Sequence, residues 1–154
     1  CIFLSYVYRI RDLKNGIVLV FLTLVCSWGN DSFAYFFGVL FGKHKLSPKV
    51  SPNKSIEGAI GGIVGGGLWG LLYGVLFGKY TGFVNPYIAF VTIGALGSIP
   101  AMIGDLAASA IKRNNDIKDY GKLIPGHGGV MDRFDSVIFT APIIYYLIVL
   151  FEWL

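Results

Sequence analysis

Four long apolar stretches dominate this 154-residue sequence, at residues 15–42, 56–78, 84–104 and 137–154. A transmembrane helix needs about 20 predominantly apolar residues, so each stretch is long enough to cross a bilayer. Charged residues make up only 14% of the chain, against about 25% in soluble domains, and the mean hydropathy is +0.65. The sequence therefore predicts an all-α fold, a polytopic transmembrane helix bundle with about four to five spans.

The chain begins at Cys1 inside an apolar run, without an initiator Met. It lacks the basic segment and the small-residue cleavage site of a signal peptide. We therefore predict that residues 1–154 form a single membrane-embedded domain, the C-terminal portion of a longer chain. Cys1 and Cys26 are too few for a disulfide or metal framework and are interpreted as packing residues.

Two polar segments, residues 43–55 and 105–136, are predicted to connect the apolar stretches, and Pro48 and Pro52 mark the first as a loop. Both are rich in Lys and Arg, which favours the cytoplasmic side of the membrane. The two apolar stretches between them supply the two crossings that this placement requires.

The topology before residue 43 stays open. The stretch 15–42 is interrupted at residues 29–32 (GNDS), so it is either one long broken helix or two short pieces. A single crossing would put the basic cluster of residues 9–14 on the outside, against the charge rule.

One apolar stretch carries a glycine at every fourth position. Small residues at this spacing form a groove in which another helix backbone approaches closely. The groove is interpreted as a packing seam within the bundle or at the interface of a homodimer. Its members are Gly58, Gly62, Gly66, Gly70, Gly74 and Gly78.

Two carboxylates, Asp31 and Asp105, lie within or beside apolar stretches, where an ionisable group is costly and indicates function. Asp31 alone is also compatible with a carboxylate that pairs two helices. If residues 105–113 are helical, Asp105, Ser109, Lys112 and Arg113 share one face. A carboxylate, a hydroxyl and two cations in line can hold a metal and an anionic group together.

Further along, residues 125–129 (PGHGG) predict a tight irregular turn, because three glycines and a proline disfavour a helix. The turn leads to Asp132 and Asp135, whose spacing places both carboxylates on one side of the last span. Mg²⁺ prefers one or two carboxylates together with phosphates and water, and Lys and Arg complement phosphate charge. The pattern predicts a metal-assisted phosphate site at the membrane surface, with a set of interfacial ion pairs as the alternative.

The sequence lacks both nucleotide-binding motifs that are common in soluble proteins, the GxxxxGK[ST] loop and the Rossmann fingerprint. Two blocks of residues nevertheless resemble the phosphatidate cytidylyltransferase (CDP-diacylglycerol synthase) family. The first runs over about 27 residues, and the second differs at Ser55, where Thr is more usual, and at Ile56, where Trp is frequent. The blocks are Ser109-Ala-Ile-Lys112-Arg113, Lys118-Asp119, Pro125-Gly-His127-Gly-Gly129 and Asp132-Arg133-Phe-Asp135, and then Asp31-Ser-Phe-Ala-Tyr35-Phe36, Gly42-Lys43, Lys45-Leu-Ser-Pro48 and Ser51-Pro52-Asn-Lys54-Ser-Ile-Glu57-Gly58.

The resemblance implies transfer of CMP from CTP to phosphatidic acid, giving CDP-diacylglycerol and pyrophosphate, with Mg²⁺ as cofactor and a second cation left open. It further implies an integral protein of a bacterial inner membrane whose active site faces the cytoplasm. The partners expected are CTP, phosphatidic acid and membrane lipid, and not nucleic acid.

On this interpretation each polar residue receives an expected role. Asp105 and Asp132 are expected to bind the metal and Lys112 the phosphates of CTP, and Asp135 and Asp31 are further candidates. His127 is either a general base or a turn residue that hydrogen-bonds the backbone. The remaining candidates for substrate binding are Ser109, Arg113, Lys43, Lys45, Lys54 and Arg133.

Two other functions are weighed against this one. A CTP-dependent polyprenol kinase would act on a neutral alcohol, which needs a true base and fewer cations than this sequence offers. An ion-coupled transporter would bind cations at Asp31 and Asp105, but the sequence shows no inverted repeat.

Overall fold

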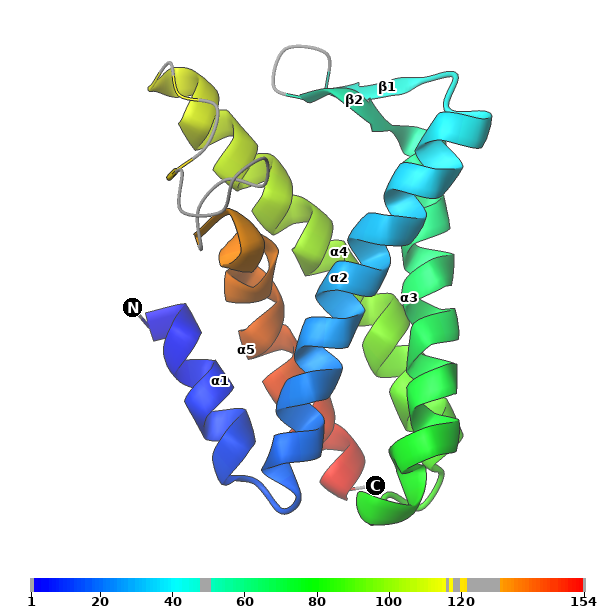
Figure 1. The fold of residues 1–154 in the computed structure, drawn as a ribbon. Helices are drawn as coiled ribbons and strands as arrows, with labels where there is room; N and C mark the ends of the chain where they lie inside the picture. Colours follow the sequence, from blue (N-terminus) through cyan, green and yellow to red (C-terminus); the bar gives the residue numbers. More distant parts are fainter. Residues whose placement is uncertain (1, 48–50, 116, 118–119, 122–130, 154) are drawn as a thin grey trace.

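The structure is a computed structural model that describes residues 2–47, 51–115, 117, 120–121 and 131–153. Within these residues the chain is almost entirely helical, with one short two-stranded hairpin (Figure 1). The elements are α1 (Ile2–Asp12), α2 (Gly16–Phe41), β1 (Lys45–Ser47), β2 (Ser51–Ser55), α3 (Ile56–Phe77), the 3₁₀ turn η1 (Gly78–Tyr80), α4 (Pro86–Asn114) and α5 (Met131–Trp153).

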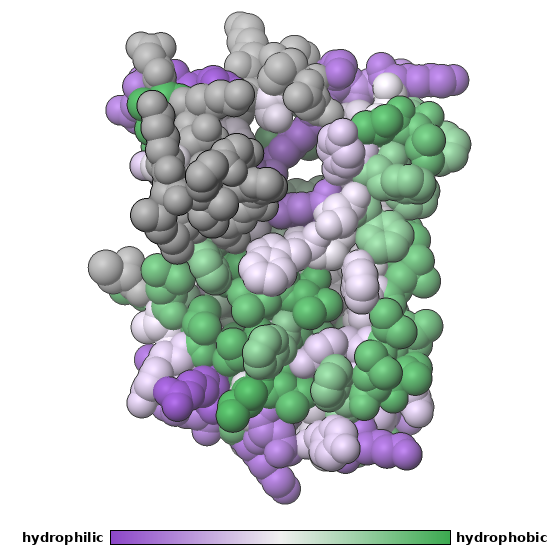
Figure 2. Space-filling model, viewed as in Figure 1, coloured by the Kyte–Doolittle hydropathy of each residue, from purple (hydrophilic) through white to green (hydrophobic). Residues whose placement is uncertain are grey.

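Four segments of the described chain are long and apolar enough to cross a membrane: Gly16–Phe41, Ile56–Tyr80, Pro86–Asn114 and Phe134–Trp153. In the space-filling view, hydrophilic residues gather at the two ends and hydrophobic residues form the band between them (Figure 2). Helix α1 has 11 residues, which at about 1.5 Å per residue is too short for a hydrocarbon core of about 30 Å. The predicted polytopic helix bundle is confirmed, and the protein is an integral membrane protein.

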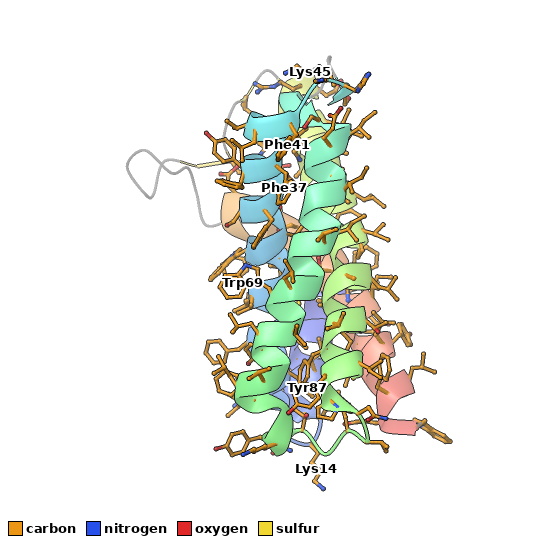
Figure 3. The ribbon with its side chains drawn as sticks, turned by 90° about the vertical axis from the view of Figure 1, so that its right-hand side faces the viewer. Lys14, Phe37, Phe41, Lys45, Trp69 and Tyr87 are labelled. Carbon is orange, nitrogen blue, oxygen red and sulfur yellow. The ribbon has the colours of Figure 1, made fainter. Side chains whose placement is uncertain are left out.

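The long helices run alternately up and down: α2 and α4 run toward the end of the bundle that holds the β1–β2 hairpin, and α3 and α5 run away from it (Figure 1). Lys14 and Lys45, which flank α2, lie at opposite ends of the bundle (Figure 3). The stretch 15–42 therefore makes one crossing, and the basic cluster of residues 9–14 lies at the end remote from Lys45. This answers the topological question that the sequence left open.

Helix α2 is continuous across the interruption at residues 29–32. Polar side chains there form hydrogen bonds without breaking the helix: the Ser32 hydroxyl donates to the carbonyl of Trp28 at 2.9 Å, and the Asn30 Nδ2 donates to Asp31 at 3.2 Å. Gly29 makes room for a neighbour, since a Cβ there would lie 2.4 Å from the Trp69 ring. The alternative of two short pieces is wrong.

Two boundaries differ from the prediction. The segment 43–55 is not simply a loop, because β1 and β2 pair antiparallel within it, and Pro52 is tolerated in a strand that has a free edge. The segment 105–136 is not all connection, because α4 continues through Asn114 and α5 already begins at Met131. Hydropathy did not predict these helical turns, because they contain charged residues. Residues 105–113 are helical, as the one-face arrangement of Asp105 and Lys112 requires.

The glycine stripe is a seam inside the bundle. A Cβ on Gly58 would lie 2.6 Å from a backbone oxygen of α2, at Ala34, whereas one on Gly70 would lie 2.1 Å from a backbone oxygen of α4, at Phe90. A second close contact joins α3 to α4, where a Cβ on Gly94 would lie 2.2 Å from the carbonyl oxygen of Gly66. The stripe therefore lets α3 pack closely against two helices in turn, which is the first of the two interpretations.

At the end of the bundle that holds Lys14, the interior is apolar. Fully buried side chains from α1, α2, α4 and α5 form one cluster there, and their exposed fractions are all 1% or less. Its largest members are Ile10, Leu19, Leu22, Phe90, Ile93, Ile144 and Ile148.

Candidate active site at the charged end of the bundle

Ion pairs join α4 to β2 and to the start of α5 toward the opposite end of the bundle. In this part of the molecule α2 and α4 diverge toward the β1–β2 hairpin (Figure 1). The space-filling view shows a hollow in this part of the molecule, bordered by hydrophilic residues (Figure 2). The groups that meet there come from four elements far apart in sequence.

Lys112 of α4 joins α4 to the first turns of α5. Its Nζ lies 3.0 Å from Oδ1 of Asp132 and 3.7 Å from Oδ2 of Asp135. The three side chains are only 8–13% exposed. The predicted spacing of the two carboxylates is thus confirmed, since both face the same ammonium group.

Tyr120 adds further contacts to this group. Its backbone N–H donates to Oδ2 of Asp132 at 2.9 Å, and its hydroxyl donates to the carbonyl of Ala108 at 3.3 Å. The Lys112 ammonium also lies 5.2 Å from the centre of the Tyr120 ring, within the range of a cation–π contact. Lys112 and Asp132 are therefore fixed from several sides.

Lys54 of β2 forms a second ion pair, with Asp105 of α4. Both side chains are 28% exposed, about twice as much as Lys112. Lys54 precedes the N-cap of α3, where the Ser55 hydroxyl accepts from the N–H of Gly58 at 3.1 Å. This capping arrangement sets the position from which the Lys54 side chain reaches across to α4.

The start of the hairpin is tied to the same helix end. Glu57 accepts from the backbone N–H of His44 at 3.2 and 3.3 Å and contacts its Nδ1 at 2.7 Å. The N–H of Ile56 donates to the carbonyl of His44 at 2.9 Å. The base of the hairpin is thus attached to α3 on both strands.

Asp31 of α2 belongs to the same cluster, because its electrostatic neighbours are Asp105, Lys54 and Asp135. Among the described residues the cluster contains four carboxylates and two ammonium groups, so its formal charge is negative by two. Buried charges are costly unless they are paired, so this excess favours the binding of cations. The six members are Asp31, Lys54, Asp105, Lys112, Asp132 and Asp135.

A cavity of about 240 Å³ opens beside Asp31 and Asp105. Lys54 lines it on the hairpin side, and Tyr35 and Met102 contribute apolar walls. Sites for whole small molecules usually measure about 300–1,000 Å³. This cavity therefore suits part of a substrate, such as a phosphate group and the atoms next to it.

The structure brings six of the predicted residues together, and four other described candidates lie outside this cluster. Lys43, Lys45 and Arg113 are exposed, and Ser109 is half-buried on α4. His127 lies outside the described residues, and so does the side chain of Arg133. Their predicted roles stay predictions.

The donor set fits Mg²⁺, although in the described part of the chain no three His, Cys, Asp or Glu side chains form a ready-made metal cage. Mg²⁺ needs only one or two protein carboxylates when phosphates and water complete its shell. Asp132 and Asp135 meet this requirement, because their side chains lie close enough together to contact one ammonium group, and each carboxylate has a second oxygen outside its Lys112 ion pair. Asp105 also interacts electrostatically with the Lys112 ammonium group.

Several residues of the site were not predicted from the sequence. Asn30 is fully buried beside the cavity, and its Oδ1 has no hydrogen-bond partner in the described structure. Its place next to Asp31 in an apolar stretch was an available signal, since intramembrane polar groups indicate function. Tyr120 and His44 gave no such signal, because their contacts depend on how the polar segments fold.

The fold and the site together define a class: a polytopic membrane protein with a cluster of carboxylates and lysines at one end. Residues 1–151 match the profile of the cytidylyltransferase family. The chain belongs to this family, and the resemblance expected from the motifs is confirmed.

Curated relatives with the name phosphatidate cytidylyltransferase support the assignment. The protein of Bacillus subtilis (strain 168) is 43% identical over 96% of this chain and 54% of its own length. That of Synechocystis is 42% identical over 91% of this chain and 46% of its own length. That of Thermotoga maritima is 40% identical over 97% of this chain and 56% of its own length. The chain thus spans about half the length of the relatives it matches.

Proposed function

We propose that this chain is the catalytic portion of an enzyme that transfers CMP from CTP to phosphatidic acid, giving CDP-diacylglycerol and pyrophosphate. The observation that carries the proposal is the charged cluster, in which carboxylates and lysines from four elements meet beside a cavity at one membrane end. The names of the relatives supply the substrates.

The chemistry requires charge neutralisation and positioning more than acid–base catalysis. An oxygen of the lipid phosphate attacks the α-phosphorus of CTP, and the bond from that phosphorus to the bridging oxygen of pyrophosphate breaks. A phosphate monoester has a second pKa of about 6, so it is largely ionised near neutral pH. The nucleophile thus needs little help from a base such as His127.

The lysines of the cluster suit the anionic partners in this reaction. Lys112, between two carboxylates, holds a fixed positive charge near the position of the leaving pyrophosphate, and Lys54 lies at the cavity beside which the lipid phosphate can approach. Exposed Lys43, Lys45 and Arg113 attract both anions from a distance.

Mg²⁺ is the proposed cofactor, and Asp132, Asp135 and Asp105 would hold it. When bound, it would neutralise the phosphate oxygens on which charge accumulates. The negative excess of the cluster supports this choice. A second cation stays a prediction.

The charged end is proposed to face the cytoplasm, where CTP is available. The connections at this end, residues 42–55 and 112–133, carry four and five Lys or Arg residues, which is nine of the 13 in the chain. Such an excess favours the cytoplasmic side, and the bacterial relatives suggest the inner membrane. A homodimer also stays a prediction. The glycine stripe is not proposed as its interface, because it packs against α2 and α4 of the same chain.

The test uses the full-length protein in phosphatidate-containing vesicles with Mg²⁺ and CTP that is labelled at either the α- or the γ-phosphate. The proposal expects α-label in the lipid product and γ-label in pyrophosphate. A polyprenol kinase, assayed with a polyprenol, would instead transfer the γ-label to the lipid. Absence of lipid label with either substrate would contradict both enzymes and favour the transporter.

A further inference from the structure

The two lysines of the charged cluster differ in how firmly they are held. Lys112 lies on a helix, is 13% exposed, contacts two carboxylates and packs over the Tyr120 ring. Lys54 contacts one carboxylate, is 28% exposed and comes from a hairpin of two short strands. Its long flexible stem allows the ammonium group to move while the backbone stays in place.

The partner of Lys54 is the carboxylate that the cluster needs elsewhere. Asp105 interacts electrostatically with Asp31, Asp135 and Lys112, so a metal ion held by Asp135 and Asp132 would draw it in. Its Oδ2 is already in contact with the Lys54 ammonium. The ammonium group and a divalent cation cannot share that oxygen at contact distance, because like charges so close repel strongly.

We propose that Lys54 and the divalent cation are alternative partners of Asp105, and that the ammonium released by the cation binds the substrate phosphate beside the cavity. The inference rests on the proposed function for the identity of that phosphate, but the exchange itself concerns only residues of this chain. Lys54 then keeps Asp105 neutralised until the metal arrives and contacts the substrate phosphate afterwards.

The exchange has a simple electrostatic logic. Without substrate, Lys54 offsets part of the negative excess of the cluster and keeps Asp105 from being buried unpaired. When a metal and an anionic phosphate enter together, the metal replaces the ammonium at Asp105, and the phosphate takes up the ammonium. Asp105 has a cationic partner before and after the exchange, so neither state leaves its carboxylate unpaired.

The experiment measures Mg²⁺ binding to the full-length protein in detergent without substrates, by isothermal titration calorimetry. Lys54→Met removes the competitor, and we expect its Mg²⁺ affinity to rise about tenfold, about 1.4 kcal/mol. Lys54→Arg keeps a cation at this position and should bind Mg²⁺ as weakly as the wild type. Lys79→Met, which removes an exposed lysine of the 3₁₀ turn η1 outside the charged cluster, is the control and should leave the Mg²⁺ affinity unchanged.

A double-mutant cycle with Asp105→Asn separates direct competition from a general loss of positive charge. The tenfold gain from Lys54→Met should disappear when Asp105 is already Asn. An unchanged or weaker Mg²⁺ affinity in Lys54→Met overturns the inference, and so does a gain that persists in the Asp105→Asn background. Undetectable binding to both wild type and variant overturns it as well.

Kinetics supply a second readout. In Lys54→Met the KM for phosphatidate should rise about tenfold while the Mg²⁺ concentration needed for half-maximal rate falls. Opposite shifts are not expected from a merely structural change, which would weaken both. If the wild type formed no CDP-diacylglycerol, the proposed function would fail, whereas the Mg²⁺ titration would still decide the exchange.

Discussion

The two ends of this bundle hold their helices together by different means. At the end near Lys14, side chains such as Leu22, Phe90 and Ile144 are completely buried against one another. At the other end, ion pairs join α4 to β2 and to α5, and Lys54 and Asp105 are each 28% exposed. The first end is packed for cohesion, and the second leaves room for a cavity of about 240 Å³.

The difference indicates which end supports the fold and which end suits the proposed chemistry. In a bilayer, helices associate through close packing, since lipid tails are as apolar as leucine. Buried ion pairs add little to stability, because removing charges from water offsets their attraction. The charged cluster is therefore expected to be important for activity and less so for folding.

The largest effect is expected from a change in the packed seam. In Gly94→Val the new Cβ would meet the carbonyl oxygen of Gly66, and a backbone clash of this kind cannot be relieved by a rotamer change. We expect almost no monodisperse protein in detergent, as measured by size-exclusion chromatography. Gly67→Ala is the control, because its Cβ would find its nearest neighbour at 3.6 Å, and a normal yield is expected. A normal yield of Gly94→Val would show that the close contact between α3 and α4 is not needed to hold the bundle together.

The next effect separates activity from stability at the charged end. Asp132→Asn removes a charge that contacts Lys112 and is a proposed metal ligand, so we expect the rate of CDP-diacylglycerol formation to fall at least about a hundred- to a thousandfold. The thermal unfolding midpoint in detergent should stay within a few degrees of the wild type. Glu152→Gln, at the other end of the same helix, should keep full activity. Near-normal turnover of Asp132→Asn would exclude Asp132 from the metal site.

The smallest effect is expected at His127. If this residue only hydrogen-bonds the backbone, His127→Ala should lower the rate less than about tenfold, whereas loss of a general base should cost about 10²–10⁴-fold. The measurement is the initial rate with saturating CTP and phosphatidate. A loss in the higher range would assign acid–base chemistry to the charged end in addition to charge neutralisation.

Much of the fold was predictable because it depends on local patterns. Apolar length located the four spans, and the regular spacing of Gly58, Gly62 and Gly66 predicted a close helix seam. The spacing of Asp132 and Asp135 correctly placed two carboxylates on one side of a helix. These features are periodic along the chain, and periodicity is what a sequence displays directly.

The rest of the site depends on contacts between distant segments. The pairing of Lys54 with Asp105 joins residues 51 positions apart, and no local pattern specifies it. The hairpin was missed because it is short and contains Pro52, and the contacts of Tyr120 depend on the path of a polar segment. Composition predicted that the carboxylates need cations, but only the fold shows which lysine meets which carboxylate.

The contact between Gly66 and Gly94 has a consequence for how the enzyme would respond to its lipid surroundings. Helices adapt to a thinner or thicker bilayer mainly by tilting. Because α3 and α4 touch backbone to backbone near their middles, they are expected to tilt as one body. Lys54, just before α3, and Asp105, on α4, would then keep their separation across membranes of different thickness.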